Sequence, residues 1–368
     1  MKNKQQSLTH STRRNFIRKG LGLCFVAITT GSYISRPFNT LKAAHKMVQF
    51  FENMDNPSSE DSHTNFYEPG YLALHRSGEL KRRGQILWQM MDVCRLCPRE
   101  CETKRLDGQK GDCGSTSQLE ISSFHPHFGE EESLVGEGGS GTIFMTHCSL
   151  RCVYCINWQI SMGGEGHLRS IEELSQMMLL LQSMGCKNIN IVTPTHYLPH
   201  MVLALDKAAA EGLNIPLVYN TSGYEKTETM CLLDGVVDIY LPDFKYYDGQ
   251  MAAKYSSDAS DYPDKVKAAL KEMYRQVGIA QPADDGLMYR GLMIRHLVLP
   301  NGISDTGEVT AWVAQNISRD TYFHLMAQYT PSYQAHRYPK LNRRINRGEY
   351  HHAIEVARKA GLNNLHIQ

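Results

Sequence analysis

Short apolar runs alternate with amphipathic segments along the chain from about residue 140 to its end. The apolar runs have the length of β-strands, and the segments between them carry apolar residues at helical spacing. The runs predict strands over 141–147, 188–193, 217–221, 236–243, 292–299 and 322–329, with a last short strand near Leu365. The intervening segments predict helices over 171–184, 199–211, 226–233, 264–277, 307–316 and 350–359.

Local signals define both ends of the first predicted helix. Ser170 and Glu173 form a capping-box pattern, in which each side chain satisfies a free backbone N–H at the start of the helix. Gly185 follows the last apolar position and is the residue type that commonly ends a helix in the left-handed conformation. The segment therefore predicts one complete amphipathic helix between two strands.

Alternating strands and helices are typical of βαβ units, whose right-handed crossovers make neighbouring strands parallel. The pattern therefore predicts the α/β class, with six strands between residues 141 and 329. In βα barrels the functional side chains gather where the strands end. Polar motifs follow the predicted strands at Cys148, 193–196, 220–222, 243–245, 300–302 and 328–331. We therefore expect one site, built from residues that are far apart in the sequence.

Three cysteines directly follow the first predicted strand: Cys148, Cys152 and Cys155, which we call the cysteine triad. Iron–sulfur clusters usually take four cysteines, so three thiolates leave one iron without a protein ligand. A metal with an open position can bind and activate a further ligand. The alternative is a zinc site in which His147 supplies another ligand.

The spacing Cys-x3-Cys-x2-Cys after an apolar strand resembles the signature of radical S-adenosylmethionine (SAM) enzymes. Further segments resemble an uncharacterised subgroup related to pyruvate formate-lyase activating enzyme. These segments are Gly-Ser-Gly-Thr-Ile-Phe (139–144), Tyr-Cys-Ile-Asn-Trp (154–158), Asn-Ile-Asn-Ile-Val-Thr-Pro-Thr-His-Tyr (188–197), Tyr-Asn-Thr-Ser-Gly-Tyr (219–224), Asp-Ile-Tyr-Leu-Pro-Asp-Phe-Lys-Tyr (238–246) and Arg-His-Leu-Val-Leu-Pro (295–300). The resemblance covers roughly residues 85 to 368 and implies a partial (β/α)6 radical SAM barrel with an N-terminal cysteine-rich extension.

The resemblance also implies a chemistry. Cys148, Cys152 and Cys155 would hold a [4Fe–4S] cluster whose fourth iron binds the amino and carboxylate groups of SAM. One electron from the reduced cluster would cleave SAM to methionine and a 5′-deoxyadenosyl radical, which abstracts hydrogen from a substrate. The protein then has to position SAM, exclude water and confine the radical.

Contacts to SAM are implied at positions on several strand ends. The candidate residues are Tyr154, Thr193, Thr195, His196, Asp243, Lys245 and Arg295. Tyr154 occupies the position of the aromatic residue that, in the family, lies against the adenine ring of SAM. The alternative is that Tyr154 only packs beside the cluster loop. Lys245 can bind the SAM carboxylate or ribose, or form only a salt bridge with Asp243. The guanidinium of Arg295 can bind a carboxylate through two parallel hydrogen bonds. That carboxylate belongs either to SAM or to a protein side chain in a structural ion pair.

The chain departs from the family pattern at two places. Many members carry Gly-Gly-Glu after the second strand, where this run receives the SAM amino group, but residues 193–196 read Thr-Pro-Thr-His here. Backbone carbonyls, a threonine hydroxyl or neutral His196 are the candidate acceptors. His147 stands where the family often has glycine, and either lines the cluster or replaces a turn residue.

A second cysteine set precedes the triad: Cys94, Cys97, Cys101 and Cys113. Glycines between residues 108 and 114 provide turns that can fold these four thiols together. Four thiolates with no open position suit an electron-relaying [4Fe–4S] cluster or a structural zinc ion. We predict the second [4Fe–4S] cluster, with zinc and no metal as the alternatives.

Composition narrows the class of protein. The 368 residues are 42% hydrophobic and 21% charged, as in ordinary globular proteins. Lys and Arg number 39 against 38 Asp and Glu, so no excess charge attracts nucleic acid or an anionic membrane. Clustered cysteines in a long α/β chain favour metal binding over a disulfide scaffold. The isolated Cys186 and Cys231 are expected to be buried apolar residues.

The N-terminal region resembles a twin-arginine export signal. Arg13 and Arg14 lie in a basic stretch, and an apolar segment (21–34) and a small-residue segment (41–45) follow. The apolar segment is shorter than the ~20 residues of a membrane-spanning helix, so no stable membrane span is predicted. Twin-arginine export would place the folded protein in the periplasm, whereas the supply of SAM and low-potential electrons favours the cytoplasm.

The predicted organisation has four parts. They are a signal region (1–44), a polar linker (45–84), a cysteine-rich segment with an auxiliary metal site (85–135) and the radical SAM core barrel (136–368).

Three functions are compatible with these patterns. The leading one is an activating enzyme that abstracts hydrogen from a backbone glycine of a partner protein, a glycyl radical enzyme. The second is radical modification of another protein or of a small molecule. The third is a non-catalytic iron–sulfur electron carrier, against which the intact triad and the strand-end motifs argue. Flavodoxin or ferredoxin is the expected electron donor, and no nucleic-acid partner is expected.

Overall fold

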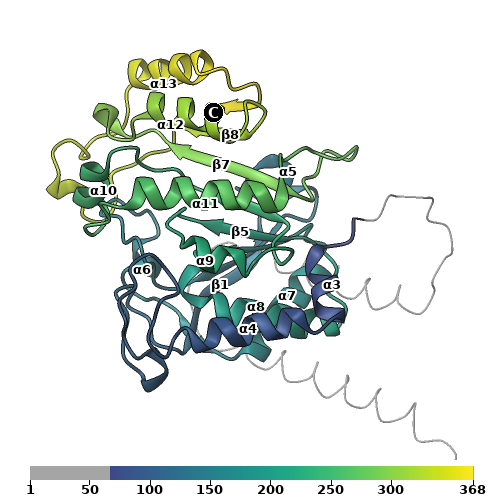
Figure 1. Cartoon of the computed structure of the whole chain (residues 1–368). Helices are drawn as coiled ribbons and strands as arrows, with labels where there is room; N and C mark the ends of the chain where they lie inside the picture. The colour runs from purple at the N-terminus through teal and green to yellow at the C-terminus, as the bar shows by residue number, and fades with distance from the viewer. Residues whose placement is uncertain (1–66, 368) are drawn as a thin grey trace, which may run out of the picture. The chain divides into compact units, whose positions relative to one another are not determined.

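A nine-stranded sheet forms the centre of the computed structural model, which describes residues 67–367 (Figure 1). The strand order is β3-β1-β2-β4-β5-β6-β7-β8-β9. The strands are β1 (Leu119–His127), β2 (Ser140–Met145), β3 (His167–Arg169), β4 (Ile189–Val192), β5 (Leu217–Thr221), β6 (Ile239–Pro242), β7 (Gly291–Leu297), β8 (Tyr322–Met326) and β9 (Leu365–Ile367).

The strands predicted between residues 141 and 329 are β2, β4, β5, β6, β7 and β8, and they lie side by side in chain order. Every neighbouring pair among them is parallel, and β9 adds a further parallel strand beyond β8. At the other edge β1 pairs antiparallel with β2, and β3 pairs antiparallel with β1. The predicted α/β fold, with six parallel strands in chain order as in a partial (β/α)6 barrel, is therefore confirmed.

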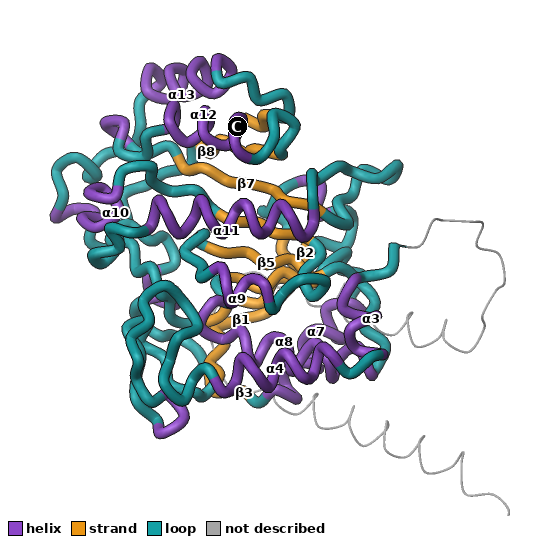
Figure 2. Tube along the Cα trace, in the orientation of Figure 1, coloured by secondary structure: helices purple, strands orange, loops and turns teal. Residues whose placement is uncertain are grey.

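Helices connect the strands and cover the sheet (Figure 2). They are α3 (Gly70–Arg76), α4 (Glu79–Gln89), α5 (Glu132–Val135), α6 (Trp158–Ser161), α7 (Ile171–Ser183), α8 (Leu198–Ala210), α9 (Thr227–Cys231), α10 (Gly249–Tyr255), α11 (Tyr262–Val277), α12 (Thr306–Asn316) and α13 (Arg347–Lys359). The predicted capping box is present at the start of α7, where Ser170 and Glu173 bond to each other's backbone N–H groups.

Two helices occupy part of the segment for which the sequence predicts a polar linker. Helices α3 and α4 bury Tyr71, Leu80 and Leu87 completely. Gly84 lets α4 approach α8, because a Cβ at this position would lie 2.7 Å from the Leu203 side chain. Residues 67–89 are thus part of the folded unit. The twin-arginine motif and most of the predicted linker lie outside the described residues.

The interior of the partial barrel is layered. Val218, Ile239 and Met293 alternate inward from three neighbouring strands and pack with Leu134 of α5. Side chains two residues further along the same strands point inward again, because successive residues of a strand alternate between its faces. Apolar side chains therefore fill the barrel interior near the start of the strands. The next inward-facing residues are polar and lie at the carboxyl ends of the strands.

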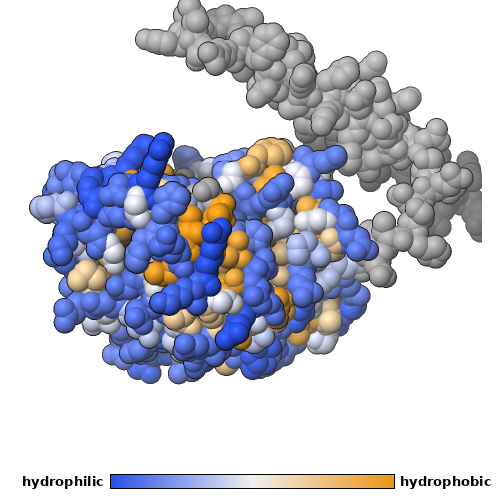
Figure 3. All heavy atoms as spheres, turned by 90° about the horizontal axis from the view of Figure 1, so that it is seen from above, coloured by the Kyte–Doolittle hydropathy of each residue, from blue (hydrophilic) through white to orange (hydrophobic). Residues whose placement is uncertain are grey.

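The surface in Figure 3 is mostly hydrophilic, with hydrophobic residues gathered near the middle of the face shown. Within residues 67–367, no helix is both long and apolar enough to cross a membrane.

Candidate functional site

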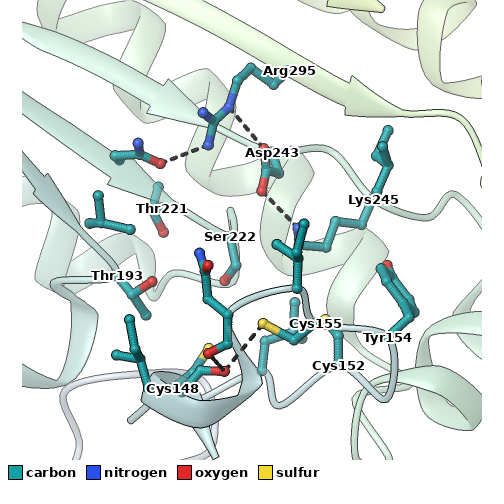
Figure 4. Close-up of a pocket in the computed structure, with 18 of the residues that line it drawn as sticks. Cys148, Cys152, Tyr154, Cys155, Thr193, Thr221, Ser222, Asp243, Lys245 and Arg295 are labelled. Atoms are coloured by element: carbon teal, nitrogen blue, oxygen red, sulfur yellow. Dashed lines mark hydrogen bonds and ion pairs between the residues drawn. The ribbon is translucent and has the colours of Figure 1, made fainter. Parts of the chain in front are cut away.

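A cavity of about 330 Å³ opens where the parallel strands end (Figure 4). It is lined by residues that follow β2, β4, β5 and β6, together with side chains of β7 and β8. The predicted site residues that line it are Cys148, Cys152, Tyr154, Cys155, Thr193, Asp243, Lys245 and Arg295. The structure thus brings together eight of the ten residues predicted for this site, and it places Thr195 and His196 elsewhere.

The cysteine triad lies on a tightly turned loop after β2. His147 and Arg151 both have left-handed backbone conformations, with φ of 66° and 54°. Glycine adopts this left-handed conformation most readily, so His147 occupies a turn position that would suit glycine. Ser256 donates a hydrogen bond to Cys152 Sγ at 3.0 Å, and Ser161 Oγ lies 3.2 Å from Cys155 Sγ. Burial raises the pKa of the Cys148 thiol to about 12, so ionisation of this thiol needs a positive partner such as iron.

A row of charges lies beside the triad. Lys245 Nζ is 2.7 Å from one carboxylate oxygen of Asp243, and Arg295 Nε is 3.1 Å from the other. Burial alone would raise the pKa of Asp243, but the charges of Lys245 and Arg295 outweigh it and hold this pKa below its usual range. Burial likewise opposes the charge of Lys245, yet the adjacent Asp243 keeps the lysine pKa above its usual value. Asp243 therefore stays ionised, and Lys245 keeps donors free for an anion in the cavity.

Arg295 is the centre of a buried network that the sequence did not predict. Its Nη2 donates to Asn220 at 2.7 Å, and its Nη1 donates to Glu130 at 3.2 Å. Glu130 also accepts hydrogen bonds from the amides of Asn190 at 2.6 Å and Asn220 at 2.9 Å. The guanidinium is thus already paired with protein groups, and its main contribution is to position Asp243 below the cavity.

Thr195 and His196 point away from the cavity. Both are about 1% exposed, and they lie on a 3-10 turn (Thr195–Tyr197) that follows the left-handed Thr193. His196 Nε2 donates to the carbonyl of Thr146 at 2.7 Å, and burial lowers the pKa of His196 to about 3. The imidazole is therefore neutral and is held within the protein core.

Thr195 instead helps to surround a buried carboxyl group, Glu225. Thr195, Tyr219 and Thr221 donate to the same carboxylate oxygen of Glu225, at 2.7, 3.2 and 2.5 Å. Burial raises the pKa of Glu225 to about 7, although these hydrogen bonds oppose the shift. Thr221 also lines the cavity, so one hydroxyl separates Glu225 from the site.

Replacing Glu225 with Gln is expected to remove one source of pH dependence. The folded-state pKa is above the unfolded value, so the folded chain binds more protons between these two values, and stability falls as pH rises. Between pH 5 and 8 the wild-type protein should lose on the order of 3 kcal/mol from this group, and Glu225→Gln should not. Urea unfolding at both pH values measures this difference. Glu228→Gln, at an exposed position, is the matched control and should behave like wild type.

Tyr154 lies between two triad cysteines and forms part of the cavity wall. Its ring makes edge contacts with Tyr246 and Tyr329, at centroid distances of 6.3 and 5.8 Å. Tyr154 is 6% exposed, and burial raises its pKa well above the usual value. The phenol is therefore neutral, and its ring offers the cavity a rigid aromatic surface.

The second cysteine set lies in the segment before β1. None of its thiols forms a disulfide; Cys94, Cys97 and Cys113 are buried and Cys101 is half-buried. Outside these two sets, Cys186 is buried as predicted, whereas Cys231 is exposed because it lies on the outer surface at the end of α9. The prediction of a buried Cys231 was therefore wrong.

The chain is similar to known proteins over most of its length. A model described as the radical SAM superfamily matches residues 142–275. The uncharacterised protein MJ0674 of Methanocaldococcus jannaschii is 30% identical over 289 residues, which cover 76% of this chain and 78% of that protein. The chain belongs to the radical SAM superfamily. The solved structure of Streptococcus suis SuiB bound to SAM matches 60% of this radical SAM protein with a TM-score of 0.41 and 15% identity, and the match spans 47% of SuiB.

Membership implies an enzyme that uses a [4Fe–4S] cluster and SAM. Within the described part of the chain, no three His, Cys, Asp or Glu side chains converge closely enough to share one metal ion. A zinc site requires such convergence, with every thiolate about 2.3 Å from the same ion. In a cluster each thiolate binds a different iron, and the three triad cysteines line one cavity with room beside them, so they suit the [4Fe–4S] cluster of this radical SAM enzyme.

Proposed function

We propose that this protein is an activating-type radical SAM enzyme, which generates a 5′-deoxyadenosyl radical and abstracts hydrogen from a backbone glycine of a partner protein. The observation that supports this function is the single cavity shared by the triad, Lys245 and the strand-end polar groups. The segments that resemble pyruvate formate-lyase activating enzyme favour a protein substrate.

Each group in the cavity has a role in this proposal. Cys148, Cys152 and Cys155 would hold the cluster, which when bound would supply the electron for cleavage of SAM. Lys245 binds the SAM carboxylate. Asp243 orients the side-chain ammonium group of Lys245 through their ion pair. The apolar lining excludes water and protects the reactive species; it includes Leu150, Ile160, Val192, Leu297 and Met326.

The proposal includes partners and a location. A flavodoxin or ferredoxin supplies the electron, and the substrate is a protein with a reactive glycine. Export by the twin-arginine route would carry the folded, cluster-loaded enzyme to the periplasm. A second metal centre, an iron–sulfur cluster or zinc, occupies the second cysteine set.

Isotope transfer tests the glycine substrate. Host proteins labelled with α-deuterated glycine and freed of metabolites would be incubated with the reconstituted enzyme, SAM and reductant. Deuterated 5′-deoxyadenosine is the result that the proposal predicts. The separated metabolites would be added in a parallel reaction. If 5′-deoxyadenosine stays unlabelled and its formation rises only with these metabolites, the result would contradict the proposal and favour a small-molecule substrate.

Replacing Lys245 with Met should weaken the binding of SAM. A charge-assisted hydrogen bond contributes about 1.5–3 kcal/mol, so the dissociation constant should rise by about tenfold to hundredfold. Asp243 remains paired with Arg295, so the variant should stay folded. Calorimetric titration with SAM measures the change, and Lys254→Met on the exposed face of α10 is the matched control. Equal affinities in the two variants would remove Lys245 from the binding site.

A further inference from the structure

Arg105 forms no ion pair with a carboxylate among the residues that the structure describes; its contacts are to Thr116, Ser115 and Cys94. Its side chain is completely buried, next to the second cysteine set. The guanidinium donates to the carbonyl of Thr116 at 2.7 and 3.1 Å and to Ser115 Oγ at 3.0 Å, and its Nη1 lies 3.7 Å from Cys94 Sγ. Arginine does not lose its proton in proteins, and a buried charge without a counter-charge is costly. A negatively charged group beside Cys94 would therefore stabilise this charge.

The second cysteine set is placed to supply that anion. Ser115, which accepts from Arg105, lies 3.2 Å from Cys113 Sγ, so the guanidinium faces Cys94 directly and Cys113 through one hydroxyl. Gly111 lets the sulfurs of Cys101 and Cys113 approach the backbone, because a Cβ here would lie 3.3 Å from Cys101 Sγ and 3.5 Å from Cys113 Sγ. The backbone of Cys94 bonds to Glu102 and Thr103 on both sides, which holds Cys94 beside Cys101.

We infer that Cys94, Cys97, Cys101 and Cys113 hold a second iron–sulfur cluster and that Arg105 compensates its negative charge. Four thiolates around a cluster core leave a net negative charge and no open position on iron. A cluster would receive each of the four thiolates on a separate iron and would place the thiolate of Cys94 beside the Arg105 guanidinium. This site goes beyond SAM cleavage and does not depend on it.

The second set also supports the triad loop. Arg99, between Cys97 and Cys101, donates to the carbonyls of Ser149 at 2.9 Å and Ser256 at 3.1 Å. In the opposite direction Arg151 of the triad loop donates to the carbonyl of Asp112 at 3.0 Å. The two cysteine loops therefore hold each other in place, so a second cluster would lie close to the triad.

Iron content tests the inference. The full chain with Cys148, Cys152 and Cys155 all replaced by Ala would be reconstituted anaerobically with iron and sulfide. We expect about four irons per chain and, after dithionite reduction, the paramagnetic signal of a [4Fe–4S] cluster. A folded variant that binds one zinc ion or no metal would overturn the inference. The wild-type assay of SAM cleavage is separate, so failure of the second cluster and failure of the proposed enzyme are distinguishable.

The role of Arg105 has its own readout. In the same triple-variant chain, Arg105→Gln should lower the reduction potential of the second cluster, because reduction adds negative charge. Arg105→Lys keeps the positive charge and should restore most of the potential, which a purely structural role would not predict. Arg95→Gln, at an exposed arginine of the same loop, is the control and should leave the potential unchanged. Equal potentials for Arg105→Gln and Arg95→Gln would refute charge compensation.

Discussion

Replacing Cys152 with Ala is expected to abolish SAM cleavage. Cys152 is one of the three cysteines that we propose as cluster ligands, and its thiol is buried beside the cavity and fixed by the hydrogen bond from Ser256. Loss of residues that merely orient metal ligands already costs about 10–100-fold, so loss of a ligand should lower the rate by more than about 100-fold. Formation of 5′-deoxyadenosine under anaerobic, reducing conditions measures this effect.

A second cysteine variant separates loss of the ligand from loss of a cysteine in general. Cys231→Ala removes an exposed thiol at the end of α9, far along the chain from both cysteine sets. This variant should retain the iron content and the cleavage rate of the wild type. If Cys152→Ala cleaved SAM as fast as Cys231→Ala, the assignment of the cluster ligands would be wrong.

Replacing Glu130 with Ala should destabilise the fold by about 3 kcal/mol. Removing one partner of a buried ion pair leaves an uncompensated charge, which typically costs 3–5 kcal/mol. Here the change leaves Arg295 without one of its two carboxylates and removes the acceptor of two asparagine amides. Because Asp243 still pairs with Arg295, we expect the lower end of that range. Urea unfolding at neutral pH measures the loss.

The matched control for this variant is Glu132→Ala. Glu132 is two residues away and exposed, so its removal should change the free energy of unfolding by less than about 0.5 kcal/mol. Equal losses for Glu130→Ala and Glu132→Ala would show that the buried network does not stabilise the barrel.

The parallel strands could be predicted because their signals are local. Apolar runs such as that of β5, which is buried along its whole length, contrast clearly with the amphipathic helices around them. β1 gave no such signal, since Ser, His and Pro residues occupy much of it and it pairs at the edge of the parallel strands. Helix α4 was missed because its many charged residues obscure the buried stripe formed by Leu80 and Leu87.

The sequence could predict which residues meet in the site, because the order and direction of the strands alone determine this. Polar residues after β2, β4 and β6 had to meet at one edge of the sheet, and Cys148, Thr193 and Lys245 do so. The direction of single side chains needed the backbone. The left-handed Thr193 turns the chain so that His196 enters the core, which no spacing rule indicates. Glu130 reaches the barrel interior from a connecting segment, so neither periodicity nor strand ends could reveal it.

The most direct test of the central claim is the reductive cleavage of SAM. The full chain, reconstituted anaerobically with iron and sulfide, would be mixed with SAM and dithionite, and 5′-deoxyadenosine and methionine would be quantified over time. We predict that both products form together in equal amounts, and that neither forms without reductant or in Cys152→Ala. A folded protein with its triad cluster in place that releases no 5′-deoxyadenosine would contradict this account.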